Sequence, residues 1–80
     1  MKHVYLIRSV SHPRKTYVGT TEDLERRLNE HNHGKSEYTA RFLPWKLEVV
    51  IQFNDSAKAD HFETYLKSGS GHAFAQRHFW

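Results

Sequence analysis

The sequence predicts a small α/β (α+β) domain with a three-stranded mixed or antiparallel sheet flanked by helices, in the order β-β-α-β-α-α. Two observations lead to this fold class. Three short segments either alternate apolar with polar residues or are continuously apolar, as strands do. Other segments place apolar residues at helical spacing. The chain of 80 residues contains no repeat, linker or low-complexity tract, so we expect one domain over residues 1–80.

The first two strands are predicted close to the N-terminus. Residues 3–8 are apolar on both alternating faces, which is typical of a central strand buried on both sides. Residues 9–15 contain Ser, His and Pro and are expected to form a loop. Residues 16–19 then form a second short strand, so the two segments predict a hairpin.

A helix follows the hairpin. Thr20 or Thr21 is expected to cap it, and the acidic residues that come next favour the positive end of the helix dipole. The helix should run to about His33 and end at Gly34, because glycine is a common helix terminator. Residues 35–44 are polar and are expected to form a loop.

The remaining elements lie in the second half of the chain. Alternate positions of 45–53 are apolar, which predicts a strand with one face in the core. Apolar residues at helical spacing predict a helix over 57–67, and the Ser-Gly-Ser-Gly run at 68–71 ends it. A last short helix is expected over roughly 72–79.

The composition excludes several classes of protein. The chain has no Cys, which rules out disulfides and a thiolate zinc site. No apolar run approaches the roughly 20 residues that a membrane span requires, and the N-terminal apolar run is too short for a signal peptide. We therefore expect a soluble, cytoplasmic protein without membrane contact.

The charges are distributed unevenly. The chain has 12 Lys and Arg against 9 Asp and Glu, a formal net charge of +3. Residues 1–21 contain no acid, and after Glu63 the only charged residues are Lys67 and Arg77. This asymmetry is compatible with a basic face for nucleic acid, although on charge alone an ordinary solvated surface is favoured.

Two polar residues of the first predicted helix face inward. Leu24 and Leu28 define its apolar stripe, and the helical angle places Arg27 and His31 on the same side. Charged residues are seldom buried without a partner. Either the Arg27 stem covers the edge of the core beside a hydrogen-bonded His31, or the two residues serve a site.

Glu63 is a third inward polar residue. It lies between Ala59 and Leu66 on the inner stripe of the predicted helix over 57–67. An inward carboxylate needs a cation, a metal or several hydrogen bonds. The structural alternative is an ion pair, either with Arg27 or with Lys67 one turn later.

Tyr5 and Tyr17 lie on the two strands of the predicted hairpin. The usual interpretation of each is a core aromatic with its hydroxyl group at the surface. Together with the inward Arg, His and Glu, they supply the groups that a metal-assisted phosphodiesterase needs. Arg can hold a phosphate through two hydrogen bonds, and Mg²⁺ often takes only one or two protein carboxylates.

These residues resemble a known family. The segment His-Val-Tyr at 3–5 and the segment Tyr-Val-Gly at 17–19, eleven residues later, are similar to the paired motif of the GIY-YIG nuclease superfamily. Arg27 and Glu63 follow where the family has its essential Arg and its metal-binding Glu. The chain resembles the small stand-alone members and the N-terminal nuclease domain of excinuclease C.

The resemblance implies a metal-dependent DNA endonuclease, in a cytoplasmic setting of the bacterial type and with a role in DNA repair. Tyr5 would be the general base or would position the water, with its pKa of about 10 lowered by nearby cations. Tyr17 would orient Tyr5 or the water. Arg27 would hold the scissile phosphate, His31 would assist either the tyrosine or the phosphate, and Glu63 would bind Mg²⁺ or Mn²⁺.

Four further features concern the motif. Gly19 would permit a close approach of the backbone or a sharp turn. His3 stands where the first motif has Gly, and the Asn that follows the Glu helix in many members is missing. Many members also carry a Lys or Arg just after the second motif, where Thr20 and Thr21 stand here. The departures at His3 and Thr20 motivate the alternative of a non-catalytic nucleic-acid-binding module on the same fold.

The expected partner is DNA of unspecified strandedness, bound by a monomer or a weak homodimer. Segment 34–41 is expected either to lie along DNA or to be a plain polar loop. Residues 68–72 either hold a phosphate or merely end a helix. The predicted DNA-binding residues are Lys35, Ser36, Tyr38, Thr39, Arg41, Lys67 and Arg77.

Overall fold

A three-stranded antiparallel sheet organises the computed structural model, which describes residues 1–80. The strands are β1 (Lys2–Ser9), β2 (Thr16–Thr21) and β3 (Trp45–Phe53). Their order is β2-β1-β3, so β1 is the central strand and β2 and β3 are the two edges. The prediction of a buried central strand at the N-terminus, followed by a hairpin, is confirmed.

Four helices complete the fold. They are α1 (Leu24–Asn32), α2 (Glu37–Ala40), α3 (Ser56–Leu66) and α4 (Gly69–His78). The predicted fold class and the order β-β-α-β-α-α are confirmed, with one addition. Segment 35–44, expected to be a loop, contains the single turn α2, closed by a hydrogen bond of 2.8 Å from the Ala40 N–H to the Ser36 carbonyl.

The caps differ in detail from the predictions. Asp23, and not Thr20 or Thr21, caps α1, because β2 continues to Thr21 and the Asp23 carboxylate accepts a hydrogen bond of 3.1 Å from the Arg26 N–H. Gly34 adopts a φ of +74° just after α1. α4 begins at Gly69, earlier than predicted.

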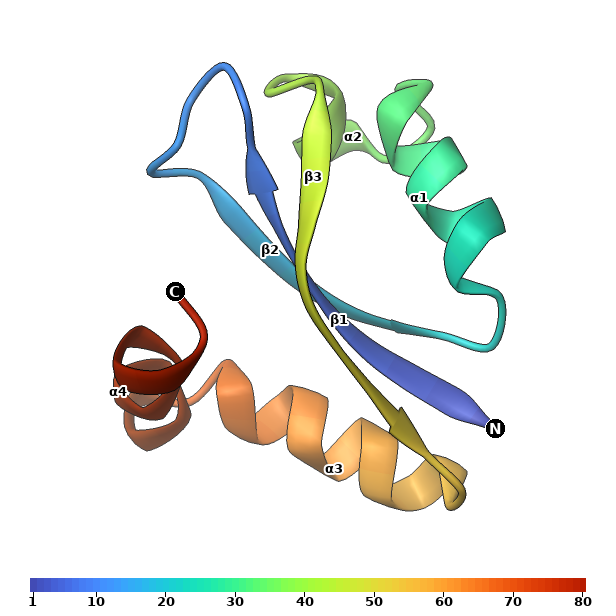
Figure 1. Cartoon of the computed structure of the whole chain (residues 1–80), viewed down its shortest axis with the longest axis vertical. Helices are drawn as coiled ribbons and strands as arrows, with labels where there is room; N and C mark the ends of the chain where they lie inside the picture. The colour runs from blue at the N-terminus through green and yellow to red at the C-terminus, as the bar shows by residue number, and fades with distance from the viewer.

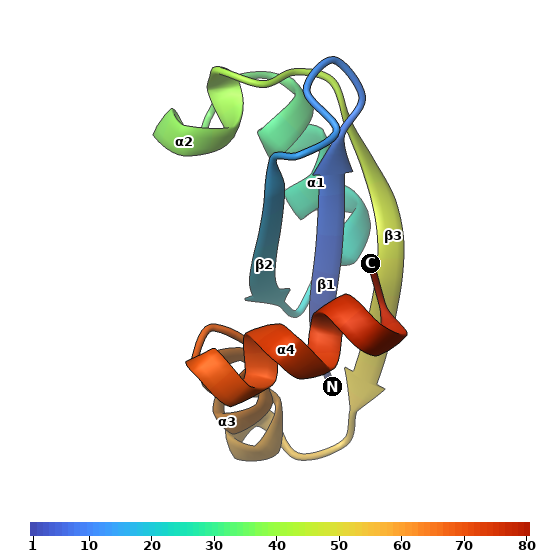
Figure 2. The same ribbon diagram turned by 90° about the vertical axis from the view of Figure 1, so that its left-hand side faces the viewer.

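The sheet carries helices on both faces. α1 and α2 lie on one side and α3 and α4 on the other, and in Figure 2 α4 crosses in front of the strands while α1 lies behind them (Figures 1 and 2). Alternate residues of β1 therefore enter two different cores.

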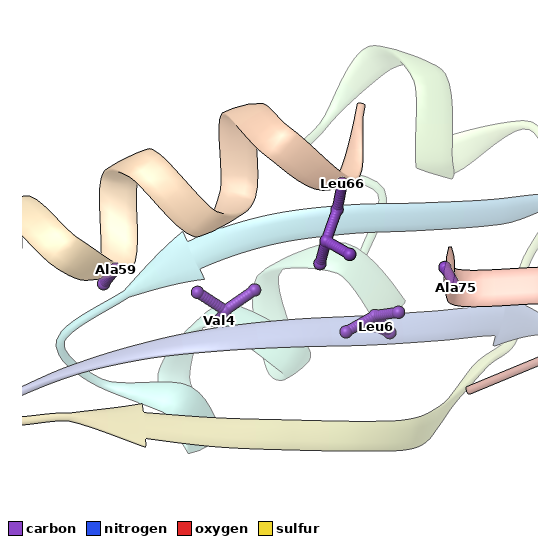
Figure 3. Packing of buried hydrophobic residues seen from close by; sticks show 5 residues of the cluster. All are labelled: Val4, Leu6, Ala59, Leu66 and Ala75. Atoms are coloured by element: carbon purple, nitrogen blue, oxygen red, sulfur yellow. The ribbon is translucent and has the colours of Figure 1, made fainter. Parts of the chain in front are cut away.

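The core under α3 and α4 is purely apolar. Val4 and Leu6 of β1 meet the inner side chains of these two helices (Figure 3). The buried members are Val4, Leu6, Ala59, Leu66 and Ala75.

The core under α1 and α2 contains polar groups as well. Its buried members are Tyr5, Ile7 and Trp45. The buried His31 and Thr39 come from α1 and α2, which pack on this same face. No helix is long and apolar enough to cross a membrane.

Candidate active site

Tyr5 is the centre of the polar cluster on the α1 face. It is 1% exposed and lies opposite Gly19 in the pairing of β1 with β2. A Cβ atom on Gly19 would lie 2.4 Å from the Tyr5 hydroxyl oxygen. Gly19 therefore makes room for that hydroxyl group, and since its φ is not in the left-handed region, close approach rather than a sharp turn explains the glycine.

His31 joins Tyr5 to α2. It lies in the last turn of α1 with no exposed surface. Its Nε2 is 2.8 Å from the Tyr5 hydroxyl oxygen, and its Nδ1 is 2.8 Å from Oγ1 of Thr39. A continuous chain of hydrogen bonds thus connects the central strand, α1 and α2.

Thr39 owes its position to the short helix α2. Its backbone carbonyl accepts a hydrogen bond of 2.7 Å from the indole Nε1 of Trp45, which ties α2 to the start of β3. The side-chain amide of Asn32 pairs with both backbone groups of Trp45, at 2.7 and 3.1 Å. No signal in the sequence indicates that Thr39 is the partner of His31, because the contact depends on the unpredicted helix.

Burial shifts the pKa values of both ring groups toward their neutral forms. Burial first, and then the positive charge of Arg27, lower the pKa of His31 to about 4, so the imidazole is neutral at pH 7. Burial also raises the pKa of Tyr5 above its usual 10, although Arg27 opposes the rise. The expectation that cations lower the Tyr5 pKa is wrong for this arrangement, because desolvation outweighs them.

Arg27 and Tyr17 flank this pair. The Arg27 side chain is 32% exposed and forms an ion pair of 3.1 Å with Glu30 on its own helix. The Tyr17 ring centroid lies 5.0 Å from that of His31 and 6.3 Å from that of Tyr5. Part of the Arg27 side chain therefore remains accessible beside the Tyr5–His31 hydrogen bond.

Glu63 lies on α3, on the other face of the sheet. Its half-buried carboxylate forms an ion pair with Lys67 one turn later, and the Lys67 ammonium lies 5.8 Å from the Tyr17 ring centroid. The predicted alternative of a structural pair with Arg27 is wrong, whereas the pair with Lys67 is formed. No hydrogen bond or ion pair joins Glu63 to Tyr5 or Arg27. Lys67, which pairs with Glu63 and contacts the Tyr17 ring, lies between the two parts of the candidate site.

The donor set can be compared with the needs of Mg²⁺. The structure has no group of three or more His, Cys, Asp or Glu side chains that could hold a metal. Mg²⁺ commonly takes one or two carboxylates and completes its octahedron with water and substrate phosphate. Glu63 supplies one half-buried carboxylate, which now pairs with Lys67, so it fits a metal of that kind and not one held in a cage of protein ligands.

The predicted DNA-binding residues differ in exposure and form three groups. Thr39 cannot reach a phosphate, because it is fully buried against His31, and this prediction is wrong. Ser36 is half-buried at the start of α2. The exposed members are Lys35, Tyr38, Arg41, Lys67 and Arg77.

Segment 68–72 forms the start of α4. The Ser68 hydroxyl accepts a hydrogen bond of 3.2 Å from the Gly71 N–H, and the Ser68 carbonyl accepts one of 2.8 Å from the His72 N–H. These bonds satisfy two of the N–H groups that a phosphate would have used. A Cβ atom on Gly71 would lie 1.7 Å from the Tyr65 carbonyl oxygen, so this glycine serves the contact between α3 and α4.

The family model described as the GIY-YIG catalytic domain matches residues 1–75. The chain belongs to this family. It is 35% identical over 82 residues to the structure-specific endonuclease subunit SLX1 of Candida dubliniensis, an alignment that covers 94% of this chain and 27% of the fungal protein. It is 44% identical over 52 residues to a UPF0213 protein of Streptococcus agalactiae, covering 64% of this chain and 59% of the bacterial protein.

The chain thus spans about a quarter of the length of the Candida relative and more than half of the Streptococcus relative. The matched stretch of the family includes both tyrosines, Arg27, His31 and Glu63.

Proposed function

We propose that this chain is an endonuclease domain that hydrolyses DNA phosphodiester bonds with a divalent metal, Mg²⁺ or Mn²⁺, at the β2 edge of its sheet. The observation that carries the proposal is the buried hydrogen bond between Tyr5 and His31 beside a partly exposed Arg27. Membership of a family of catalytic domains supports it, as does the similarity to fungal proteins named as endonuclease subunits.

The proposed proton transfer uses Tyr5 and His31 as a neutral pair. The pKa of Tyr5 is above 10 and that of His31 is about 4, so neither is charged at pH 7. As the water oxygen bonds to phosphorus and the bond to the leaving oxygen breaks, the water proton passes to the Tyr5 oxygen and the Tyr5 proton passes to Nε2 of His31. This concerted transfer avoids a free phenolate, which burial disfavours.

Thr39 sets the direction of this transfer. Nε2 of His31 can accept a proton only in the tautomer in which Nδ1 carries the hydrogen and donates it to Oγ1 of Thr39. The Thr39 hydroxyl group then points to the Ser36 carbonyl oxygen, 3.4 Å away. We therefore assign Thr39 as a positioning residue that acts through His31.

Arg27 and Glu63 are proposed to handle the charge of the substrate. The Arg27 guanidinium would hold the scissile phosphate and offset its charge in the transition state. The bound phosphate would in turn offset the positive charge that lowers the pKa of His31, which makes His31 a stronger base when substrate is present. Glu63 would hold the metal, whose chemistry is to stabilise the leaving oxygen as a Lewis acid.

A comparison of two charge-matched variants tests the proposal. Branched and linear DNA are incubated with Mg²⁺ or Mn²⁺ and wild type, Glu63→Gln or Glu25→Gln, an exposed carboxylate of α1. We expect metal-dependent cleavage that Glu63→Gln reduces by about a hundredfold or more and Glu25→Gln leaves unchanged. Undiminished cleavage by Glu63→Gln would sink the proposed metal site.

The same assay separates the non-catalytic alternative. Tight, salt-sensitive DNA binding by the wild type, without cleavage of any substrate at any metal concentration, would identify a binding module instead of an enzyme.

A further inference from the structure

A cavity of about 370 Å³ opens at the β2 edge, next to the candidate site. β2, α2, the end of α3, α4 and the C-terminal residue contribute to its walls, and in Figure 2 α2 lies above β2 while α3 and α4 lie below it. Tyr17 belongs both to this cavity and to the aromatic cluster around Tyr5. A ligand in the cavity would therefore adjoin the proposed point of cleavage.

Three aromatic rings line the cavity, namely those of Tyr17, Tyr38 and Trp80. The rings of Tyr17 and Tyr38 are stacked, with centroids 6.1 Å apart and planes inclined by 29°. The Tyr38 ring also packs edge-on against Phe42 at 5.5 Å, while the Arg8 guanidinium lies 5.2 Å from the Trp80 ring. Neighbouring side chains thus hold these rings in place before any ligand arrives.

Tyr38 differs from the other two because it is 42% exposed although its ring contacts those of Tyr17, Phe42 and Trp45. A fixed, half-exposed aromatic ring is a stacking platform for another planar group. The remaining wall is largely apolar and includes Leu66 of the core.

The charge of the cavity indicates what kind of planar group it takes. Its polar lining includes His72 and Lys67, whose ammonium also pairs with Glu63 on the same helix face, and no acidic residue lines it. Such a lining suits an apolar ring that is attached to an anion. A nucleobase on a phosphate backbone has this chemistry, since its faces stack on aromatic rings while its phosphates pair with cations.

We propose that this cavity receives an unpaired nucleobase of the DNA strand whose phosphate lies at Tyr5 and Arg27. The proposal rests on the proposed function and deepens it by naming the substrate class. Bases inside a regular duplex are stacked on each other and extruding one costs free energy, so a strand with a single-stranded segment or a branch offers a base to the cavity at the least cost. Tyr38, predicted from the sequence to bind DNA, then acts as a stacking surface.

The test measures binding without cleavage. A duplex with a single-stranded tail that contains 2-aminopurine is titrated with protein in the presence of a chelator at fixed salt. We expect quenching of the 2-aminopurine fluorescence and weak binding of the blunt duplex. Tyr38→Leu should weaken tail binding by about 5- to 150-fold, the effect of losing one base–aromatic stack.

Two variants control for the ring and for general damage. Tyr38→Phe keeps the aromatic face and should bind the tail as the wild type does. Tyr65→Leu removes a similarly exposed ring, 39% exposed on α3, that does not line the cavity, and should also bind normally. Thermal unfolding of each variant checks that it folds.

Equal affinity for tailed and blunt duplex, or equal effects of Tyr38→Leu and Tyr65→Leu, would overturn the base site. If cleavage with metal persists in that case, the proposed endonuclease function stands alone. Quenching that depends on Tyr38, combined with no cleavage under any condition, supports the base site and overturns the endonuclease.

Discussion

The buried His31 makes the stability of this fold depend on pH. The pKa of its imidazole is 6.5 in an unfolded chain and about 4 in the folded protein. Between these two values the unfolded chain binds a proton that the folded protein does not, so the free energy of unfolding falls as the pH falls. The His31 contribution is fully present above pH 6.5 and is lost as the pH falls through 4.

The magnitude follows from the same two values. A pKa difference of about 2.5, at about 1.4 kcal/mol for each pKa unit, amounts to about 3.5 kcal/mol, of which about 3 kcal/mol is lost between pH 7.5 and pH 4. For a domain whose total stability is of the order of 5–15 kcal/mol, this is a large share. Acidification to pH 4 should therefore remove a substantial part of the stability, in addition to any effect of the carboxylates.

Denaturant unfolding at pH 7.5 and pH 4, at constant ionic strength, measures this loss. His31→Gln removes the titrating group. Between pH 7.5 and pH 4, the free energy of unfolding of the variant should therefore fall by about 3 kcal/mol less than that of the wild type. His33→Gln, an exposed histidine just after α1, is the matched control and should follow the wild type. If His31→Gln and the wild type lose the same stability, the assignment of a buried neutral imidazole is refuted.

Three other substitutions test the packing around the site. Gly19→Ala places a methyl group 2.4 Å from the Tyr5 hydroxyl oxygen, so we expect a loss of roughly 1–3 kcal/mol in denaturant unfolding, and wild-type stability would contradict the contact. Thr39→Val leaves Nδ1 of His31 without its hydrogen-bond partner and should lower the free energy of unfolding by about 1–3 kcal/mol. The NMR signal of the His31 imidazole should change as well, and an unchanged signal would argue against the tautomer assigned above. Gly71→Ala meets the backbone of α3 at 1.7 Å and should lower the unfolding temperature clearly, a prediction that fails if the temperature stays the same.

Local patterns were sufficient for the secondary structure and for the inward direction of several side chains. Apolar alternation predicted the strand β3, and the helical angle between Leu24 and His31 correctly placed the imidazole on the inner face of α1. Both depend only on the repeat of one element, which the sequence contains. The prediction that one face of β3 lies in the core is wrong in part, because Trp45 packs in the core under α1 and α2, Val49 packs against the core under α3 and α4, and Leu47 is 39% exposed.

Relations between elements were harder to predict. An ion pair between Glu63 and Lys67 can be predicted from one helix, because the two residues lie one turn apart. An ion pair between Glu63 and Arg27 can be judged only when the face of the sheet that each helix covers is known. The direction of the Tyr5 pKa depends on how deeply α1 and α2 bury it. α2 itself is a single turn fixed by Trp45, and so short a helix has no periodic signal.

The central claim is that the Tyr5 hydroxyl group takes part in the cleavage of DNA. Single-turnover cleavage of a tailed duplex with saturating Mg²⁺, by wild type and Tyr5→Phe at matched DNA occupancy, tests it most directly. Phe fills the same buried space without the hydroxyl group, so we predict unchanged DNA affinity and a cleavage rate lower by about a hundredfold or more. A Tyr5→Phe variant that cleaves within a few-fold of the wild-type rate would contradict the account.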